Sequence, residues 1–313
     1  MNSLKYIDLF AGIGGIRIPF DELGHTCVFS SEMDKFAQET YEANFGEKPF
    51  GDITKISPND IPEHDILLAG FPCQPFSIIG DKKGFSDTRG TLFFNIESIL
   101  QVKRPKAFLL ENVKGLKSHD KGRTFQTIVK KLEELNYNVH TTVLNSLDYG
   151  LPQKRERTFL VGFLDDVEFQ FPEPSKNRAS LIDILESDSE VDKSLFASEM
   201  IVEKRMAKVK EGYPTPSIWH ENKTGNISAL TYSCALRAGG SYNYLLVNGI
   251  RRPSAREFLR IQGFPEDYKV VVSYTQHRKQ IGNSVSVPVI RAIAKEMMKA
   301  LNKYTENEIE KAS

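Results

Sequence analysis

Short apolar runs alternate with helical stretches through the first half of this 313-residue chain, and this alternation limits the possible folds more than any other feature. It is typical of an α/β protein in which helices connect mostly parallel strands. The spacing of apolar residues predicts helices over Lys35–Phe45 and Gly122–Leu135. The predicted strands are Tyr6–Phe10, Thr26–Ser30, Asp65–Ala69, Ala107–Leu110, Val139–Leu144 and Thr158–Phe163.

The alternation stops near Pro172, and from there to about Arg251 the sequence carries turn residues, an acidic stretch and few clear elements. We therefore predict a smaller second domain with a hinge over residues 173–280, built from short strands and loops. Residues 1–172 and 281–313 are predicted to form the larger domain. An amphipathic helix over Val289–Tyr304 would belong to it.

Composition leaves the function open. Equal numbers of basic and acidic residues, 41 of each, give no net charge, which counts mildly against a nucleic-acid-binding protein. Three cysteines are too few and too scattered for a disulfide framework or a zinc site, so we expect no metal. No stretch approaches the roughly 18 apolar residues of a membrane span, and no signal peptide is evident. We expect a cytoplasmic protein without membrane contact.

A glycine-rich turn, residues 8–15, follows the first predicted strand. Its spacing is GxGG rather than GxGxxG, because Arg17 stands at the position of the third glycine. Glu32 ends the second strand about twenty residues later, where dinucleotide-type folds place a carboxylate on ribose hydroxyls. A lone glycine turn can be purely structural, but with Glu32 it favours a cofactor that contains adenosine. Asp52 can accept a hydrogen bond from adenine beside Ile53, although alone it is better explained as a turn residue or helix cap.

One cysteine differs from the other two in its surroundings. Cys73 lies between Pro72 and Pro75, directly after a predicted strand, where open α/β sheets bind their ligands. Cys27 and Cys234 fit the usual interpretation of a small buried side chain. A thiol with a pKa of about 8.5 requires local activation to act as a nucleophile at neutral pH.

Three further groups have both a functional and an ordinary explanation. Glu111 ends a strand and would share a pocket with Cys73 if their strands are neighbours, but it can equally open the next helix. Arg155 and Arg157 lie on one face of an extended segment and suit an anionic substrate or a base edge, although charge runs are usually solvated. Asn283, near the C-terminal end, can cap a helix or bind a ligand.

Together these segments resemble a known family. In this order, DLFAGIGG, GFPCQPFS, ENV, QKRER, RRPSAREFLRIQGFP and QIGNSVSVPV resemble the motif set of the cytosine-5 DNA methyltransferases, and most of all the small bacterial enzymes of restriction–modification systems. The resemblance covers nearly the whole chain except about 172–238, where family members carry their individual target-recognition region. It implies a Rossmann-like, mixed, mostly parallel sheet with an S-adenosylmethionine site, and a smaller, largely β or irregular target-recognition domain.

The implied reaction transfers a methyl group from S-adenosylmethionine, leaving S-adenosylhomocysteine, to carbon 5 of a cytosine flipped out of a short specific sequence in double-stranded DNA. Cys73 would add to carbon 6, Glu111 would bind the ring, and Arg155 and Arg157 would form the positive side of the pocket. The cofactor residues that the resemblance implies are Phe10, Gly12, Gly14, Gly15, Glu32, Met33, Asp52, Ile53, Pro72 and Asn283. Met33 departs from close relatives, which often have an aromatic residue there, so we expect weaker stacking on adenine.

DNA contacts are expected from two segments. The stretch from Ser77 to Gly90 is predicted to close over the flipped base. The expected DNA contacts are Gln74, which follows Cys73, and Ser77, Lys82 and Arg89 within the stretch. Ile79 stands where some relatives have a serine that contacts DNA, which puts that contact in doubt. In the second domain, Arg237 lies in a glycine- and tyrosine-containing stretch and can bind guanine, although a structural loop explains each residue of this stretch nearly as well.

Other functions remain open at this stage. A tRNA cytosine-5 methyltransferase is the nearest alternative, but the Cys-Phe-Thr signature of that branch is missing. A nicotinamide-dependent oxidoreductase would leave the Cys73 loop without a role, and a silent DNA-binding module would not be expected to retain Cys73 and Glu111. A cognate restriction endonuclease would act on the same DNA site without stable contact, and one active site per chain permits a monomer.

Overall fold

The computed structural model of the chain describes residues 3–72, 91–175, 177 and 179–312. The predicted site residues Cys73, Gln74, Ser77, Lys82 and Arg89, like Ile79 and the predicted loop 77–90, lie outside this part. The chain divides into two compact units. Unit 1 consists of residues 1–144, 156–173 and 290–313, and unit 2 consists of residues 145–155 and 174–289.

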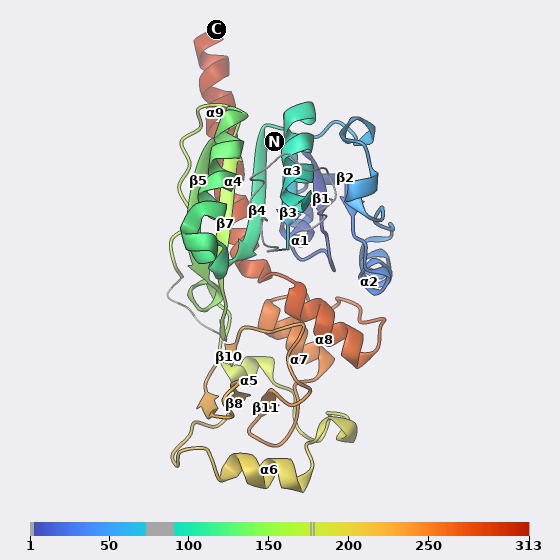
Figure 1. Ribbon diagram of the computed structural model, residues 1–313, viewed down its shortest axis with the longest axis vertical. Coiled ribbons are helices and arrows are strands. Elements are labelled where there is room, and N and C mark those ends of the chain that lie inside the picture. Colours follow the sequence, from blue (N-terminus) through green and yellow to red (C-terminus); the bar gives the residue numbers. More distant parts are fainter. Residues whose placement is uncertain (1–2, 73–90, 176, 178, 313) are drawn as a thin grey trace. The chain divides into compact units, whose positions relative to one another are not determined.

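Unit 1 is built on a six-stranded sheet with the strand order β2-β1-β3-β4-β7-β5 (Figure 1). Its strands are β1 (Lys5–Leu9), β2 (Thr26–Ser31), β3 (Ile66–Gly70), β4 (Ala107–Val113), β5 (Asn138–Asn145) and β7 (Glu156–Phe163). Its helices are α1 (Arg17–Glu22), α2 (Lys35–Phe45), α3 (Thr91–Lys103), α4 (Arg123–Glu134) and α9, which begins in unit 2 (Val287–Ala312).

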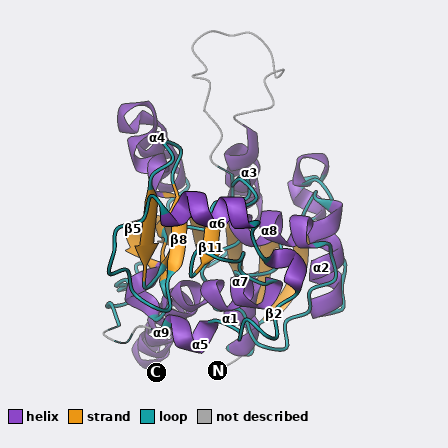
Figure 2. Ribbon diagram, turned by 90° about the horizontal axis from the view of Figure 1, so that it is seen from below, coloured by secondary structure: helices purple, strands orange, loops and turns teal. Residues whose placement is uncertain are grey.

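Helices cover both faces of this sheet, with α3 and α4 on one face and α1 and α9 on the other (Figures 1 and 2). The strands β3, β4 and β7 are largely apolar and buried on both sides, as strands covered on two faces require. On one face, Leu67 and Phe108 pack with Ile96 of α3 and Ile128 of α4 in a buried cluster. Burial of this apolar surface is the main driving force that holds the helices on the sheet.

Strand direction determines where the site lies. β1 pairs in parallel with β2 and with β3, and β3 pairs in parallel with β4, so these four strands end at the same edge. β7 runs antiparallel to β4, which pairs Arg157 at its start with Val113 at the end of β4. The glycine turn, Glu32, Phe71 and Glu111 therefore all follow or end strands at one edge of the sheet.

Unit 2 contains smaller sheets and several helices. A three-stranded sheet has the order β11-β8-β9, and β6 pairs with β10. Its strands are β6 (Gln153–Lys154), β8 (Ile218–Glu221), β9 (Ile227–Leu230), β10 (Ser233–Cys234) and β11 (Leu245–Val247). Its helices are α5 (Leu181–Ile184), α6 (Glu199–Met206), α7 (Ala255–Gln262) and α8 (Tyr274–Asn283). Trp219 of β8 is fully buried in this unit.

The predicted α/β class with a mixed, mostly parallel sheet is confirmed. Each predicted strand is present with ends shifted by a few residues, and helix α2 spans the predicted residues. Helices α5 to α8 add to the short strands and loops that the sequence indicated for the second domain. Residues 145–155 and 281–289 pack with unit 2, whereas the sequence analysis assigned them to the larger domain. Within the described residues, no helix is long and apolar enough to cross a membrane.

Candidate active site

Hydrogen bonds from the backbone and to the Glu32 side chain hold the glycine turn at the end of β2. The Ala11 amide donates to the Ser31 carbonyl at 2.9 Å. The Glu32 carboxylate accepts from the Gly12 amide at 2.9 Å with one oxygen and from the Asp34 amide at 2.8 Å with the other. Glu32 therefore fixes the turn at the position where a ribose is expected, in addition to its predicted role in binding hydroxyls.

Two glycines of the turn have different surroundings. Gly12 and Gly14 both have positive φ, 56° and 76°, which favours glycine. A Cβ on Gly14 would lie 2.2 Å from the Phe45 ring, whereas a Cβ on Gly12 would have only the Phe10 carbonyl oxygen at 4.0 Å. Phe10 itself has a φ of 55°, and Gly15 is buried. Gly14 is therefore needed for packing, and Gly12 has open space on the side of the turn.

Arg17 is a residue of this site whose role the sequence analysis did not identify. Its guanidinium donates to Asp21 at 2.7 Å and to the Tyr41 hydroxyl at 2.9 Å, and lies 4.4 Å from the centre of the Phe45 ring. It also forms an ion pair with Glu47. In place of a third glycine, the chain thus has a buried arginine that joins the glycine turn to α2. The departure of the sequence from GxGxxG at this position was the signal that could have identified Arg17.

The predicted adenine end of the cofactor site combines carboxylates with exposed apolar side chains. Asp52 caps the short helix Ile53–Lys55, as the ordinary explanation of this residue expects, and Ile53 is only 3% exposed. Met33 is 73% exposed, and Phe50, which stacks on Phe29 at 4.8 Å, is 59% exposed. The Phe50 carbonyl accepts from the Glu32 amide, so the backbones of these two residues are joined. These residues fit the adenosine part of S-adenosylmethionine.

The predicted catalytic carboxylate is held at the end of β4. The Glu111 side chain is 11% exposed, and its carboxylate oxygen lies 3.1 Å from the Nε atom of Arg157, which is 17% exposed. The pKa of Arg157 is lowered by burial, against the opposing effect of the Glu111 charge. Register pairs Glu111 with Gly70 of β3, and a Cβ on Gly70 would lie 3.8 Å from the carboxylate. Glu111 thus faces the end of the strand that precedes Cys73.

Asn112 connects the end of β4 to the segment before Cys73. Its side-chain amide donates to the Phe71 carbonyl at 2.9 Å, and its side-chain oxygen accepts from the Val113 amide at 2.8 Å. Asn112 is 1% exposed, and the next residue after Phe71, Pro72, is exposed. Both ends of the Asn112 side chain are therefore used to fix the backbone two residues before the predicted nucleophile.

The other two cysteines are poor nucleophiles. Burial raises the pKa of Cys27 in β2 to about 12 and that of Cys234 in β10 to about 11. Neither thiol would be appreciably ionised at neutral pH. This supports the interpretation that they are structural.

Arg155 and Arg157 fall in different units. The buried Arg155 guanidinium donates to the Leu236 carbonyl at 3.0 Å and to the Gly282 carbonyl at 3.3 Å, and it also contacts the Ser284 carbonyl. In this structure Arg155 therefore organises backbone carbonyls of unit 2, and its predicted place beside the base oxygen stays a prediction. Asn283 is exposed at the last position of α8.

Arg237, the predicted base-reading residue, is exposed in unit 2. Its guanidinium lies 4.8 Å from the centre of the Tyr244 ring and 3.3 Å from the Nε2 atom of His220. Its own amide donates to the Tyr244 hydroxyl at 3.1 Å. Arginine stacked on a ring keeps its donors available for a base edge, which is the requirement for guanine recognition.

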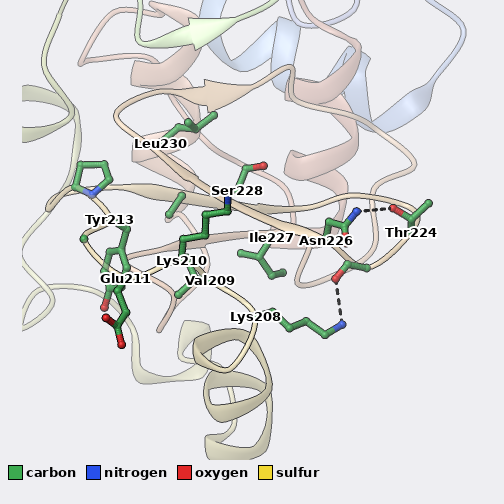
Figure 3. Close-up of a pocket in the computed structure, with 14 residues that line it drawn as sticks. Lys208, Val209, Lys210, Glu211, Tyr213, Thr224, Asn226, Ile227, Ser228 and Leu230 are labelled. Atoms are coloured by element: carbon green, nitrogen blue, oxygen red, sulfur yellow. Dashed lines mark hydrogen bonds between the residues drawn. The ribbon is translucent and has the colours of Figure 1, made fainter.

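A pocket of about 710 Å³ lies elsewhere in unit 2, between residues 208–214 and 224–230 (Figure 3). Lys208 donates to the Gly225 carbonyl at 3.0 Å across it, and Asn226 donates to the Thr224 hydroxyl at 3.2 Å. None of the predicted site residues lines this pocket, so it is separate from the motifs. Within the described part of the chain, no group of three or more His, Cys, Asp or Glu residues could hold a metal.

The fold and the site of unit 1 define a class of protein, an α/β enzyme with a nucleotide-cofactor site at the carboxyl ends of parallel strands. Comparison with known proteins makes the assignment specific. The family model of C-5 cytosine-specific DNA methylases matches residues 4–299, and the chain belongs to this family.

Characterised relatives are similar over almost their full length. The chain is 63% identical to the type II methyltransferase M.NgoBI of Neisseria gonorrhoeae, over 93% of this chain and 92% of that protein. It is 61% identical to M.HaeII of Haemophilus aegyptius, over 97% and 96% of the two chains. It is 43% identical to M.HhaI of Haemophilus parahaemolyticus, over 96% of each.

Solved structures support the fold. A Spodoptera frugiperda DNMT2 variant matches with a TM-score of 0.75 and 23% identity, over 95% of this chain and 100% of that one. The Entamoeba histolytica methyltransferase EhMeth matches with a TM-score of 0.76 and 19% identity, over 96% and 99%. These two likenesses concern the fold only.

The chain is therefore a DNA cytosine-5 methyltransferase, and its family uses S-adenosylmethionine. The family assignment favours DNA over the tRNA alternative. It also rejects the oxidoreductase and the silent DNA-binding module, because both lack this activity.

Proposed function

We propose that the chain is the modification enzyme of a restriction–modification system and that it methylates one cytosine within a short duplex sequence through a covalent bond to Cys73. The observation that carries this proposal is the position of Glu111, which faces the end of β3 while Arg157 holds its carboxylate at 3.1 Å. The relatives named type II methyltransferases support the biological role.

In the proposed reaction, the Cys73 thiolate adds to carbon 6 of the cytosine, and the electrons of the carbon 5–carbon 6 bond move towards N3. Glu111 shares with N3 the proton that the ring takes up. Arg157 orients Glu111, which enters the reaction carrying this proton and gives it to N3 as Cys73 adds, and the resulting carboxylate stays paired with Arg157 and accepts a hydrogen bond from the protonated ring. S-adenosylmethionine supplies the methyl group to carbon 5. Loss of the carbon 5 proton to water, return of the N3 proton to Glu111 and expulsion of Cys73 as a thiolate then restore the aromatic ring.

The cofactor residues have separate proposed tasks. Glu32 would accept from the ribose hydroxyls with its remaining lone pairs while it holds the Gly12 amide. Phe10, Gly12, Gly14, Gly15 and Pro72 would shape the methionine side of the site, and Asn283 would help to close it. Met33, Asp52 and Ile53 would surround adenine, with the exposed Met33 as the stacking group.

DNA would be bound by both units. Gln74, Ser77, Lys82 and Arg89 are proposed to contact the duplex around the flipped base, and Arg155 to face the base oxygen. Unit 2 is proposed to recognise the target sequence through Arg237. We further propose a monomer in the cytoplasm, where bacterial DNA lies, and a cognate endonuclease that acts on the same site without stable contact.

A trapping experiment tests the proposal. The protein would be incubated with tritiated S-adenosylmethionine and duplex DNA that contains 5-fluorocytosine, because fluorine at carbon 5 blocks the final elimination. We expect a labelled, denaturant-resistant adduct from the parent and none from Cys73→Ser, while Cys27→Ser and Cys234→Ser behave as the parent. An adduct on similarly substituted tRNA alone, or an adduct with C73S, would contradict the proposal.

A further inference from the structure

Unit 2 carries a cluster of arginines and tyrosines around the segment 237–244, which we call the recognition loop. This loop connects β10 to β11. The loop itself contains Arg237, Tyr242 and Tyr244, and two further arginines, Arg252 and Arg278, stack on Tyr242. All of them belong to unit 2.

The loop has one close-packed conformation. Tyr244 is 4% exposed, and its amide donates to the Ser241 carbonyl at 3.2 Å. A Cβ on Gly240 would lie 2.6 Å from the Tyr244 ring, so the chain must be glycine there. The Gly240 amide donates to the Arg237 carbonyl at 3.2 Å, which closes the turn directly after the predicted base-reading residue. The position of the Arg237 side chain therefore depends on the shape of the loop.

Helix α8 holds this loop at two places. Arg278 donates to the Ser241 carbonyl at 2.8 Å and to the Gly240 carbonyl at 3.3 Å. One turn later, a Cβ on Gly282 would lie 2.2 Å from the Ala238 amide nitrogen, so the helix backbone is in direct contact with the start of the loop. Residues four positions apart lie on the same face of a helix. α8 thus supports the loop with a single face.

The arginines of the cluster have no acidic partner within the part of the chain that the structure describes. Within the described residues, none of Arg237, Arg252 and Arg278 forms an ion pair with a carboxylate. Arg252 donates to the Asn243 side chain at 3.0 Å, and both Arg252 and Arg278 stack on Tyr242, at 4.2 and 5.1 Å from the ring centre. Three neighbouring positive groups repel each other, and a polyanion such as a DNA duplex would relieve that repulsion.

We infer that Arg278 is a specificity-determining positioning residue, which holds the recognition loop so that Arg237 is presented to one base of the target sequence. Arg278 acts on the loop carbonyls and not on the base. This inference rests on the proposed function of unit 2 in sequence recognition. Its consequence is that loss of Arg278 relaxes the choice of DNA sequence, whereas loss of an ordinary phosphate contact would weaken binding to all sequences alike.

The test measures sequence preference directly. The parent, R237A, R278Q, R278K and K279Q would each methylate a mixture of duplexes with random bases on both sides of one cytosine, and bisulfite sequencing would identify the methylated molecules. Preference at each position is the ratio of the favoured base to the others, normalised to the total methylation by the same variant. A merely structural loss of activity changes the total and leaves this ratio unchanged.

We expect R278Q and R237A to lose preference at the same base position by about tenfold, within the roughly 5- to 150-fold discrimination of a bidentate base contact. R278K keeps the charge and donors without the planar fork, so it should lie between parent and R278Q. K279Q, which removes an exposed charge one residue further along α8, should match the parent.

The failures are distinguishable. If R237A lost preference and R278Q kept it, the inference about Arg278 would be overturned while the proposed role of Arg237 stood. If R237A kept the preference of the parent, the proposed role of Arg237 and the inference that rests on it would both be wrong. Should R278Q fail to fold, R278K decides, because a preference identical to that of the parent would overturn the inference.

Discussion

The Nε atom of Arg157 lies 3.1 Å from a carboxylate oxygen of Glu111, and both side chains are largely buried. The two residues come from antiparallel neighbours, the end of β4 and the start of β7. Because the pair lies at the edge where β3 ends, Arg157 fixes the direction of Glu111 towards the proposed position of the substrate. Arg157 thus holds Glu111, in addition to its proposed role as a positive group of the pocket.

Replacing Arg157 with glutamine should slow methyl transfer in a single turnover by about 100-fold or more, because the Glu111 carboxylate loses its charged partner. R157K should recover part of the rate. Glu156→Gln is a matched control, since Glu156 pairs with Lys114 at a more exposed position. Rapid-quench measurement with labelled S-adenosylmethionine gives the rate, and an R157Q rate equal to that of the parent would remove Arg157 from the site.

Replacing Asn112 should lower the rate of methylation more than it weakens cofactor binding. Asn112→Asp replaces the donor to the Phe71 carbonyl with an acceptor, and an unpaired buried carbonyl costs about 1–3 kcal/mol. We expect methylation to fall at least about tenfold, with the Kd for S-adenosylmethionine within about threefold of the parent value. Calorimetric titration and a methylation assay would check this. A large increase in Kd with an unchanged rate would contradict it.

Alanine at the two glycines of the turn should have different effects. Gly14→Ala places a Cβ 2.2 Å from the Phe45 ring, so it should lower the Tm by several degrees. Gly12→Ala has space in the free protein, so it should lower the Tm less. In G12A the new methyl group occupies the expected cofactor side and should raise the Kd for S-adenosylmethionine. Thermal melts with and without the cofactor distinguish the two variants. Equal Tm values for G12A and G14A would count against the different roles assigned to Gly12 and Gly14.

The sequence predicted the structure best where the periodicity of apolar residues identifies a strand and where a residue's position along the strand determines its place in the sheet. The strands β3 and β4 were predictable because their apolar runs are buried on both faces, and the strand ends then brought Glu32, Phe71 and Glu111 to one edge. The pairing of Glu111 with Arg157 could not be predicted, because it depends on β7 inserting antiparallel beside β4. The motif order identified the family, whereas no single motif did.

Unit 2 was less predictable for a physical reason. Its helices α7 and α8 are amphipathic over short lengths and begin at serine caps, Ser254 and Ser273, which are common in loops as well. The contacts of Arg155 with the Leu236 and Gly282 carbonyls join segments more than 80 residues apart, which local patterns do not reveal. Arg278 has no motif of its own, and only the structure connects it to the recognition loop.

Thiol labelling should report one reactive cysteine. Burial raises the pKa of Cys27 to about 12 and of Cys234 to about 11, so their thiolate fractions at pH 7.5 are very small. Brief treatment with iodoacetamide at this pH should therefore modify Cys73 alone, and Cys73→Ser should take up no label. Peptide mass spectrometry locates the modification. Labelling of Cys27 or Cys234 at a rate equal to that of Cys73 would contradict the prediction.

The stability of the protein should depend on pH through Asp8, which is fully buried in β1. Neither carboxyl oxygen has a hydrogen-bond partner among the described residues, and burial raises the pKa of Asp8 to about 8. The unfolded chain ionises Asp8 near pH 3.9, so the folded state loses stability as the pH rises from about 4 to about 8, and the loss is complete above that. Asp8→Asn removes this dependence. The Tm of D8N should exceed that of the parent by at least about 3 °C at pH 8, with a gap that closes towards pH 4.

Asp65 provides a control of opposite sign. Burial raises its pKa, but hydrogen bonds from Lys106 and the Lys5 amide outweigh this and lower the pKa overall. The stability that Asp65 contributes is therefore present above its unfolded pKa and is lost as the pH falls through the folded value. Asp65→Asn should lower the Tm at neutral pH and converge with the parent in acid. Melting curves of the parent, D8N and D65N from pH 4 to pH 9 would separate the two effects, and a D8N curve parallel to the parent throughout would mean that Asp8 is already ionised in the folded protein.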